Sequence, residues 1–121
     1  MKIICKGRGK GKTTQLLYTS DTTRVPILVP TEQEKLDLID ESQRLGLNIP
    51  NPISVTDIRN QKTRGTHIDK CYVDNAEYVL QSLINMEIGA MTLSNEEKKE
   101  TYLCGSTLIV TDDDMKRKIK L

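Results

Sequence analysis

The chain has 121 residues, which is enough for one domain with one substantial core and too few for two. Lys and Arg number 18 against 17 Asp and Glu, so the net charge of +1 argues for no particular polyanionic partner. Nucleic acid stays open as a partner, although the net charge does not support it. Phe and Trp are absent and Tyr occurs four times, which leaves little for an aromatic platform that stacks single-stranded bases.

An apolar run at residues 3–5 (Ile-Ile-Cys) predicts a first strand, and a glycine-rich segment follows it directly. Residues 6–14 read Lys-Gly-Arg-Gly-Lys-Gly-Lys-Thr-Thr. A helix should come next, because Leu17 and Ser20 share a helical face with Thr13. A glycine-rich loop that ends in Gly-Lys-Thr between a strand and a helix is typical of a P-loop, or Walker A motif. The alternative is an ordinary strand-to-helix turn with basic residues.

The residue types of this loop fit the chemistry of a nucleoside triphosphate, with ATP as the expected nucleotide and Mg²⁺ as its metal. Backbone N–H groups converge on the phosphate oxygens, and the positive end of the following helix adds attraction. Lys12 should reach the β- and γ-phosphates, and the Thr13 hydroxyl should ligate Mg²⁺. The usual first glycine of the motif is replaced by Lys6. The expected nucleotide-binding residues are Gly7, Arg8, Gly9, Lys10, Gly11, Lys12, Thr13 and Thr14.

Strand and helix signals alternate after the loop, which is typical of a mainly parallel sheet covered by helices. A strand is predicted at 25–29. Thr31 and Glu34 form a capping box that starts a helix, and Gly46 ends that helix. The prolines within residues 48–52 predict a loop, because each disfavours a helical conformation in the residue before it.

The next elements are shorter. A strand at 53–55 leads into a helical turn opened by Thr56 or Asp57, and residues 63–67 read as an exposed loop. A strand at 71–73 precedes a helix at 76–84, which carries Val79, Leu80 and Leu83 on one face. A fifth strand is predicted at 88–93, apolar enough to lie inside the same sheet.

The last quarter of the chain reads as an extension, residues 96–121, to a motif-bearing core of about residues 2–95. Ser94 and Glu97 repeat the capping-box pattern and predict a solvated helix at 96–100. A strand is expected at 107–111, and with 115–121 it forms either a strand and a turn or a hairpin. The expected fold is therefore α/β, a single three-layer domain over 1–121 with about five strands.

A phosphate loop needs a carboxylate partner for its metal ion, and such a residue commonly follows a buried strand. Asp74 follows the strand at 71–73 and is therefore the expected second Mg²⁺ ligand with Thr13. The alternative is that Asp74 only caps the helix beginning near Ala76. Glu77, in the first turn of that helix, either acts as a base or simply favours the helix dipole. The catalytic candidates are Lys12, Asp74 and Glu77.

Four segments stand in the order of a known set of motifs: Gly-Lys-Thr at 11–13, Val-Pro-Thr-Glu at 29–32, Val-Asp-Asn-Ala-Glu at 73–77 and Met-Thr-Leu-Ser at 91–94. They resemble RecA-like P-loop NTPases, particularly the first motor domain of superfamily 1 and 2 helicases. The resemblance implies a nucleotide site beside Asp74 and a Pro-Thr segment near nucleic acid. The loop alone is similar to that of cobalamin adenosyltransferases. The size and motif order resemble small bacteriophage P-loop proteins.

Two departures from that pattern predict slow hydrolysis. Hydrolytic members usually carry Glu after the metal-binding Asp, but this chain has Asn75, whose amide cannot accept a proton from water. From the length of 121 residues we also expect no second RecA-like domain to supply an arginine in the same chain. We therefore expect Mg-nucleotide binding with weak hydrolysis, stimulated by a protein partner or a second copy that brings an arginine. The alternatives are a non-catalytic interaction module whose shape the nucleotide sets, and a small-molecule kinase or transferase.

The remaining polar candidates and the cysteines carry weaker expectations. Arg64 is a solvated loop residue or a phosphate contact, His67 receives no catalytic role, and the basic residues 116–118 follow three aspartates that offset their charge. The three cysteines lack metal-ligand spacing and are expected to be buried thiols in a reducing compartment. No apolar run is long enough to span a bilayer and no signal-peptide pattern is present, so we expect no membrane partner and a cytoplasmic location, the host cytoplasm for a phage protein.

Overall fold

The computed structural model describes residues 3–4, 11–60, 65, 68–92, 102–104 and 107–110 of the chain. The chain divides into two compact units, one of residues 13–86 and one made of residues 1–12 and 87–121. The larger unit combines helices with a parallel sheet, and it is therefore α/β as predicted. A single domain over the whole chain stays a prediction.

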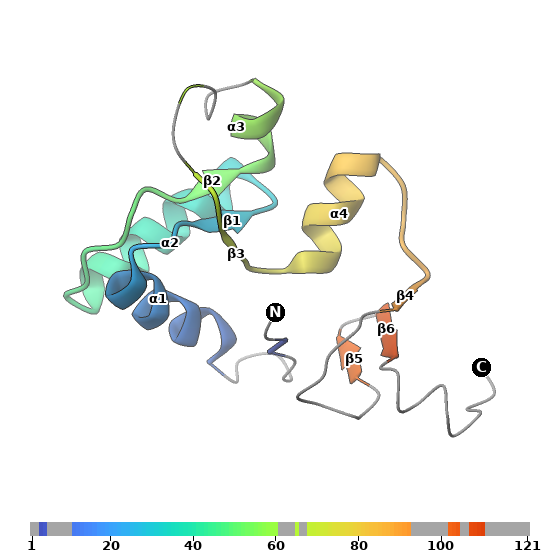
Figure 1. The fold of residues 1–121 in the computed structure, drawn as a ribbon, viewed down its shortest axis with the longest axis horizontal. Coiled ribbons are helices and arrows are strands. Elements are labelled where there is room, and N and C mark those ends of the chain that lie inside the picture. The colour runs from blue at the N-terminus through green and yellow to red at the C-terminus, as the bar shows by residue number, and fades with distance from the viewer. Residues whose placement is uncertain are drawn as a thin grey trace. The chain divides into compact units, whose positions relative to one another are not determined.

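The sheet of the larger unit has three parallel strands in the order β2-β1-β3 (Figure 1). The central strand β1 pairs through Leu28 with Ile53 on one side and Val73 on the other. The strands are β1 (Ile27–Val29), β2 (Ile53–Ser54) and β3 (Tyr72–Val73), and the helices are α1 (Lys12–Thr23), α2 (Glu32–Arg44), α3 (Val55–Arg59) and α4 (Ala76–Ile84).

Hydrophobic residues of β1 are buried on both faces of this sheet. Successive strand residues point to opposite faces, and all three residues of β1 are buried. Ile27 and Val29 belong to a cluster with Leu17 of α1 and Leu38 of α2. Leu28 belongs to a second cluster with residues of β2, α3 and α4: Ile53, Val55 and Val79. The clusters place α1 and α2 against one face of the sheet and α3 and α4 against the other.

The ends of α2 confirm two local predictions. Thr31 is its N-cap, and the Thr31 hydroxyl accepts the N–H of Glu34 at 3.1 Å. Gly46 has a φ of +73°, and the N–H groups of Gly46 and Leu47 donate to the carbonyls of Gln43 and Ser42. This pair of bonds is the Schellman arrangement, which requires a left-handed residue just beyond the helix.

The start of α3 differs from the prediction. Ser54 is the N-cap, and it forms a capping box with Asp57 in which each side chain accepts the other's backbone N–H at 3.0 Å. The sequence predicts that Thr56 or Asp57 opens this turn. Ile53 and Ser54 end the strand one residue earlier than predicted, because the Ser54 hydroxyl satisfies a helical N–H that would otherwise lack a partner.

The other unit contains a second sheet of three strands, in the order β4-β6-β5. Its strands are β4 (Ala90–Thr92), β5 (Tyr102–Cys104) and β6 (Thr107–Val110). The pair β4 and β6 is parallel, and β5 and β6 are antiparallel. A strand beginning at Thr107 is confirmed as β6, and its antiparallel partner is β5. Residues 115–121, expected to follow it as a turn or the second strand of a hairpin, lie outside the described residues.

The single sheet of about five strands is therefore not what the described residues form. The strand predicted at 88–93 exists as β4, but it pairs with β6 instead of joining β1 and its neighbours. Ile3 and Ile4 are in no strand, and Cys5 lies outside the described residues, as does the helix expected at 96–100. Apolar strands fit any sheet with an open edge, so composition alone does not select the partner.

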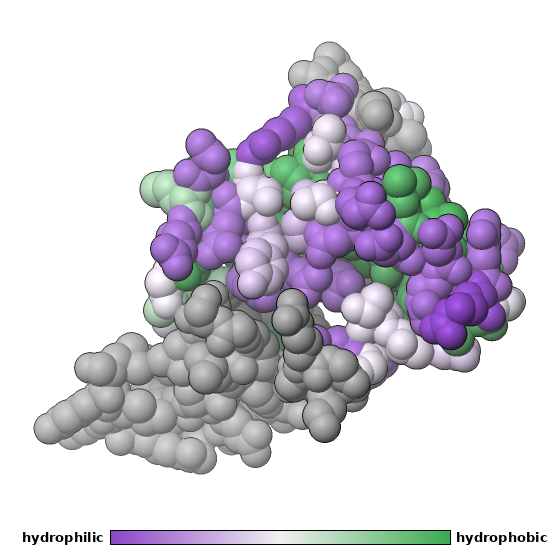
Figure 2. Space-filling model, turned by 180° about the vertical axis from the view of Figure 1, so that it is seen from behind, coloured by the Kyte–Doolittle hydropathy of each residue, from purple (hydrophilic) through white to green (hydrophobic). Residues whose placement is uncertain are grey.

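On the face that Figure 2 shows, the described residues are mostly polar, with apolar residues gathered in separate places between them. Cys71 is exposed, which corrects the expectation of a buried thiol. It lies just before β3, an edge strand of its sheet, so part of its face stays uncovered. Leu80 and Leu83, predicted to share a face of α4 with Val79, are 41% and 42% exposed. Among the described helices, none is long and apolar enough to cross a membrane.

Candidate functional site

The described part of the predicted P-loop is its last segment, Gly11 to Thr14. Gly11 has a φ of +81°, a backbone conformation that suits glycine, and α1 begins at the next residue, Lys12. The first turn of α1 carries no acidic residue, so no carboxylate there competes for the positive end of the helix. The other predicted nucleotide-binding residues, Gly7, Arg8, Gly9 and Lys10, lie outside the described residues.

The two predicted metal ligands lie next to each other. The Thr13 hydroxyl donates to Oδ2 of Asp74 at 3.1 Å, across 61 residues of sequence. Leu17 holds α1 in the core with no exposed surface, and the Ser20 hydroxyl donates to the Val25 carbonyl at 2.6 Å. Because α1 packs on the sheet in this way, its first turn reaches the end of β3.

The backbone of Asp74 is held by the central strand of the sheet. Its N–H donates to the Leu28 carbonyl at 3.0 Å, and the residue is only 7% exposed. The N-cap of α4 is Asn75, whose carbonyl accepts the N–H groups of Tyr78 and Val79. The N-cap residue of α4 is thus Asn75 and not Asp74.

Asn75 is connected to a residue that the sequence did not single out as a site residue. Its φ and ψ are +57° and +56°, and its side chain makes no capping bond. Instead, Nδ2 of Asn75 donates to Oε1 of Glu34 at 3.0 Å, and Oε2 of Glu34 accepts the Thr31 hydroxyl at 3.1 Å. The carboxyl ends of the adjacent parallel strands β1 and β3 lie at the same edge of the sheet, which brings α2 and Asn75 together.

A second pair of polar contacts continues along this edge at the end of β2. The Ser54 hydroxyl donates to Oε1 of Glu32 at 2.6 Å, and Nζ of Lys35 lies 2.9 Å from Oδ2 of Asp57. Burial raises the pKa of the Asp57 carboxyl, but the Ser54 N–H and the Lys35 ammonium outweigh burial and hold that pKa well below its usual range. Asp57 is thus ionised and structural.

Glu77, the third predicted catalytic residue, lies in the first turn of α4. The side-chain amide of Asn75 is directed to Glu34 and not to Glu77. Both roles considered for Glu77, a base and a partner of the helix dipole, stay predictions. Arg64, His67 and the basic residues 116–118 lie outside the described residues.

The Thr13 and Asp74 oxygens suit a magnesium ion. The described part of the chain contains no group of three or more His, Cys, Asp or Glu side chains that could hold a metal ion by themselves. Mg²⁺ commonly takes one or two carboxylates from a protein and completes its octahedral shell with water and substrate phosphate. One hydroxyl and one carboxylate at hydrogen-bond distance are therefore a fitting protein share of such a shell.

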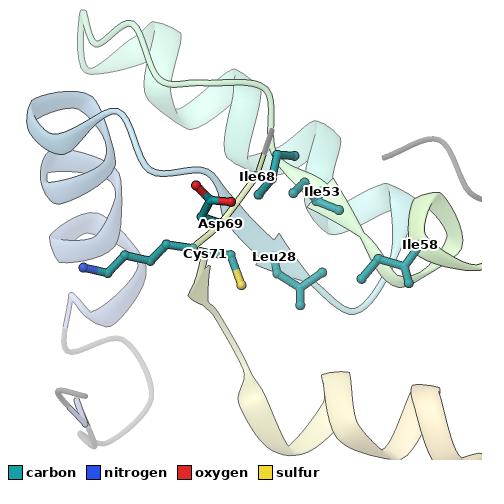
Figure 3. Close-up of a pocket in the computed structure, with 7 residues that line it drawn as sticks. Leu28, Ile53, Ile58, Ile68, Asp69 and Cys71 are labelled. Carbon is teal, nitrogen blue, oxygen red and sulfur yellow. The ribbon is translucent and has the colours of Figure 1, made fainter. Parts of the chain in front are cut away.

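An apolar hollow of about 280 Å³ lies elsewhere on the same unit. Figure 3 shows the side chains of Leu28, Ile58 and Cys71 directed to the same side of the sheet. Asp69, Lys70 and Cys71 line it from the segment before β3, at the opposite strand end from Asp74. Of the predicted nucleotide and metal residues that the structure describes, Gly11 to Thr14 and Asp74, none lines this hollow.

Comparison of the chain with protein-family models, curated proteins and solved structures finds no match.

Proposed function

We propose that the chain binds a Mg-nucleotide, ATP in the first place, at the start of α1 and the end of β3. In this proposal the glycine-rich loop and Lys12 hold the phosphates, and Thr13 with Asp74 provides the protein oxygens around Mg²⁺. The single observation that carries it is the 3.1 Å hydrogen bond between Thr13 and Asp74. A Gly-Lys-Thr sequence is common by chance, but its threonine has no general reason to lie against a buried aspartate that follows a parallel strand.

The proposal includes a fold of the RecA-like P-loop type, in which helices cover both faces of a mainly parallel sheet. Two core clusters on opposite faces of β1 support that layering for the larger unit. It also includes weak hydrolysis that a protein partner or a second copy accelerates by contributing an arginine, an effect worth about 10³–10⁵ in rate in P-loop enzymes.

The test is calorimetric titration of the full chain with ATPγS, with and without Mg²⁺. Asp74→Asn removes the negative charge that is directed to the metal, and Thr13→Val removes the hydroxyl oxygen. We expect each substitution to weaken Mg-dependent binding roughly 10- to 100-fold, the equivalent of one charged contact. Thr13→Ser keeps the hydroxyl and should bind like the unaltered chain. Lys12→Ala should weaken binding with or without the metal.

Asp69→Asn is the matched control, because Asp69 is an exposed aspartate on the segment before the same strand. It should leave the titration unchanged. Equal losses for Asp69→Asn and Asp74→Asn, or no binding by the unaltered chain, would contradict the proposal. Tight binding without turnover, alone or with partners, would instead identify a non-catalytic module that responds to the nucleotide.

A further inference from the structure

We propose that Glu34 supplies the carboxylate that orients the attacking water and accepts its proton, and that the Asn75 amide holds Glu34 in place. The inference rests on the proposed nucleotide site and concerns the step that follows binding. It assigns a base to a chain in which the residue after the metal-directed aspartate is an amide.

The need for a carboxylate from another element follows from the chemistry of Asn75. A side-chain amide donates two hydrogen bonds and accepts others, but it takes no proton from water near neutral pH. The amide of Asn75 is also already used, because it donates to Oε1 of Glu34 at 3.0 Å. Asn75 therefore does not provide a carboxylate itself, but its amide holds the carboxylate of Glu34, which comes from α2.

The backbone makes this arrangement specific. Asn75 adopts a left-handed conformation, which is uncommon outside glycine and which aspartate and asparagine tolerate best. Asp74 is fixed by its bond to Leu28 on the central strand, and Glu34 lies in the first turn of the helix that follows that strand. Two adjacent parallel strands thus carry Asp74 and Glu34 to one edge of the sheet.

Glu34 keeps the capacity to act on water. Within the described part of the chain, its two oxygens accept one hydrogen bond each, from Asn75 and from the Thr31 hydroxyl. An ionised carboxylate has about four acceptor sites, so these two bonds leave acceptor capacity on both oxygens. Neither donor is charged, so the negative charge of Glu34 is not neutralised by these contacts. Glu32, in the same turn of α2, is directed instead to Ser54 at the far strand β2.

The step is a simple hydrolysis. The water oxygen forms a bond to the terminal phosphorus, and the bond from that phosphorus to the oxygen bridging to the next phosphate breaks. The leaving nucleoside diphosphate keeps that electron pair. One proton of the water passes to Glu34 and then to the released phosphate or to solvent, which regenerates the carboxylate.

The test is single-turnover hydrolysis of Mg-ATP by the full chain, with the affinity for Mg-ATPγS measured in parallel. Glu34→Gln keeps the hydrogen bond from Asn75, and Gln also suits this capping position. We expect its hydrolysis rate to fall about 100-fold or more while its affinity stays within about twofold. Asn75→Gly removes the amide at a position where glycine is unstrained, and it should also lower the rate without weakening binding.

Glu32→Gln is the matched control, since it removes a carboxylate from the same turn of α2 and has the same effect on the helix dipole. Its rate should equal that of the unaltered chain. A Glu34→Gln rate equal to the control, or a loss on Glu77→Gln alone, overturns the inference. So does nucleotide binding without any hydrolysis, which leaves the proposed binding site intact. Failure to bind Mg-ATPγS at all contradicts the proposed function itself.

Discussion

The carboxylate of Asp57 lies inside the fold and is held there by Lys35 and Ser54. Nζ of Lys35 and the N–H of Ser54 both contact Oδ2 of Asp57, at 2.9 and 3.0 Å. The side chains of Asp57 and Lys35 are 5% and 15% exposed, so the pair is largely removed from water. Loss of one member would leave the other charge buried without its partner, which costs more than the pair itself contributes.

We expect Asp57→Ala to lower the free energy of unfolding by about 3 kcal/mol at pH 7, measured by urea denaturation. The pKa of Asp57 is depressed in the folded state, so the carboxylate stabilises the fold fully above its unfolded pKa, roughly 4, and loses that effect as pH falls further. The difference between the two proteins should therefore shrink below about pH 4. Adding Lys35→Met should recover part of the loss.

Asp40→Ala provides the control for this pair, because Asp40 is an exposed aspartate on α2, the helix that carries Lys35. Asp40→Ala should change the free energy of unfolding by no more than about 0.5 kcal/mol at every pH. A loss for Asp57→Ala that stayed constant down to pH 2 would show that the ionised pair is not its cause.

At the scale of single elements, the end of α2 depends on one glycine. Gly46 adopts a φ of +73°, and its N–H and that of Leu47 complete the Schellman bonds to Gln43 and Ser42. Gly46→Ala should lower the free energy of unfolding by about 1 kcal/mol, because a Cβ strains the left-handed conformation. Apart from Gly46 and its two chain neighbours, no described residue has an atom within 4 Å of the added methyl group, so a packing clash does not contribute.

Gly89→Ala is the control that separates backbone strain from the other effects of replacing a glycine with alanine. The space around Gly89 is equally open, but its φ is not in the left-handed range. Urea denaturation should show a change within about 0.5 kcal/mol for this control. Equal effects of the two substitutions would mean that the conformation of Gly46 is not what stabilises the helix end.

The elements that the sequence predicted well are those with local signals. Thr31 and Gly46 mark the ends of α2 through bonds that span at most a few residues, so three or four letters suffice to predict them. The capping box of Ser54 and Asp57 is equally local, but Ser54 also fits the end of the strand before it. The predicted start of α3 is therefore one to two residues too late. Boundaries of short elements are decided by such competition between neighbouring hydrogen bonds.

Long-range pairings were only partly predictable. The sequence places Asp74 near Thr13 because a carboxylate after an apolar strand is itself a recognisable pattern, and the two side chains are hydrogen-bonded. The contact between Glu34 and Asn75 was not predicted, since it spans 41 residues and depends on β1 and β3 being neighbours. Strand order is set by packing on both faces of the sheet, and the same reason explains why β4 was expected in the wrong sheet.

For the molecule as a whole, the proposed site makes folding and ligand binding a linked equilibrium. Thr13 and Asp74 come from opposite ends of the larger unit's sequence and meet only in the folded protein. A ligand that needs both therefore binds the folded state and not the unfolded chain. With free Mg-ATPγS at about 100 times its Kd, the free energy of unfolding should rise by about 2.7 kcal/mol, seen as a higher urea midpoint.

Lys12→Ala removes the expected phosphate contact, and its urea midpoint should not respond to that same nucleotide concentration. A titration with Mg²⁺ alone tests whether the metal ion itself stabilises the fold. We expect Mg²⁺ alone to raise the urea midpoint less than Mg-ATPγS does, because Mg²⁺ needs the phosphate oxygens to complete its coordination shell. A midpoint that stayed fixed for the unaltered chain, despite binding seen by calorimetry, would mean that the ligand contacts residues that are equally accessible before folding. The binding residues would then lie outside the Thr13 and Asp74 pair.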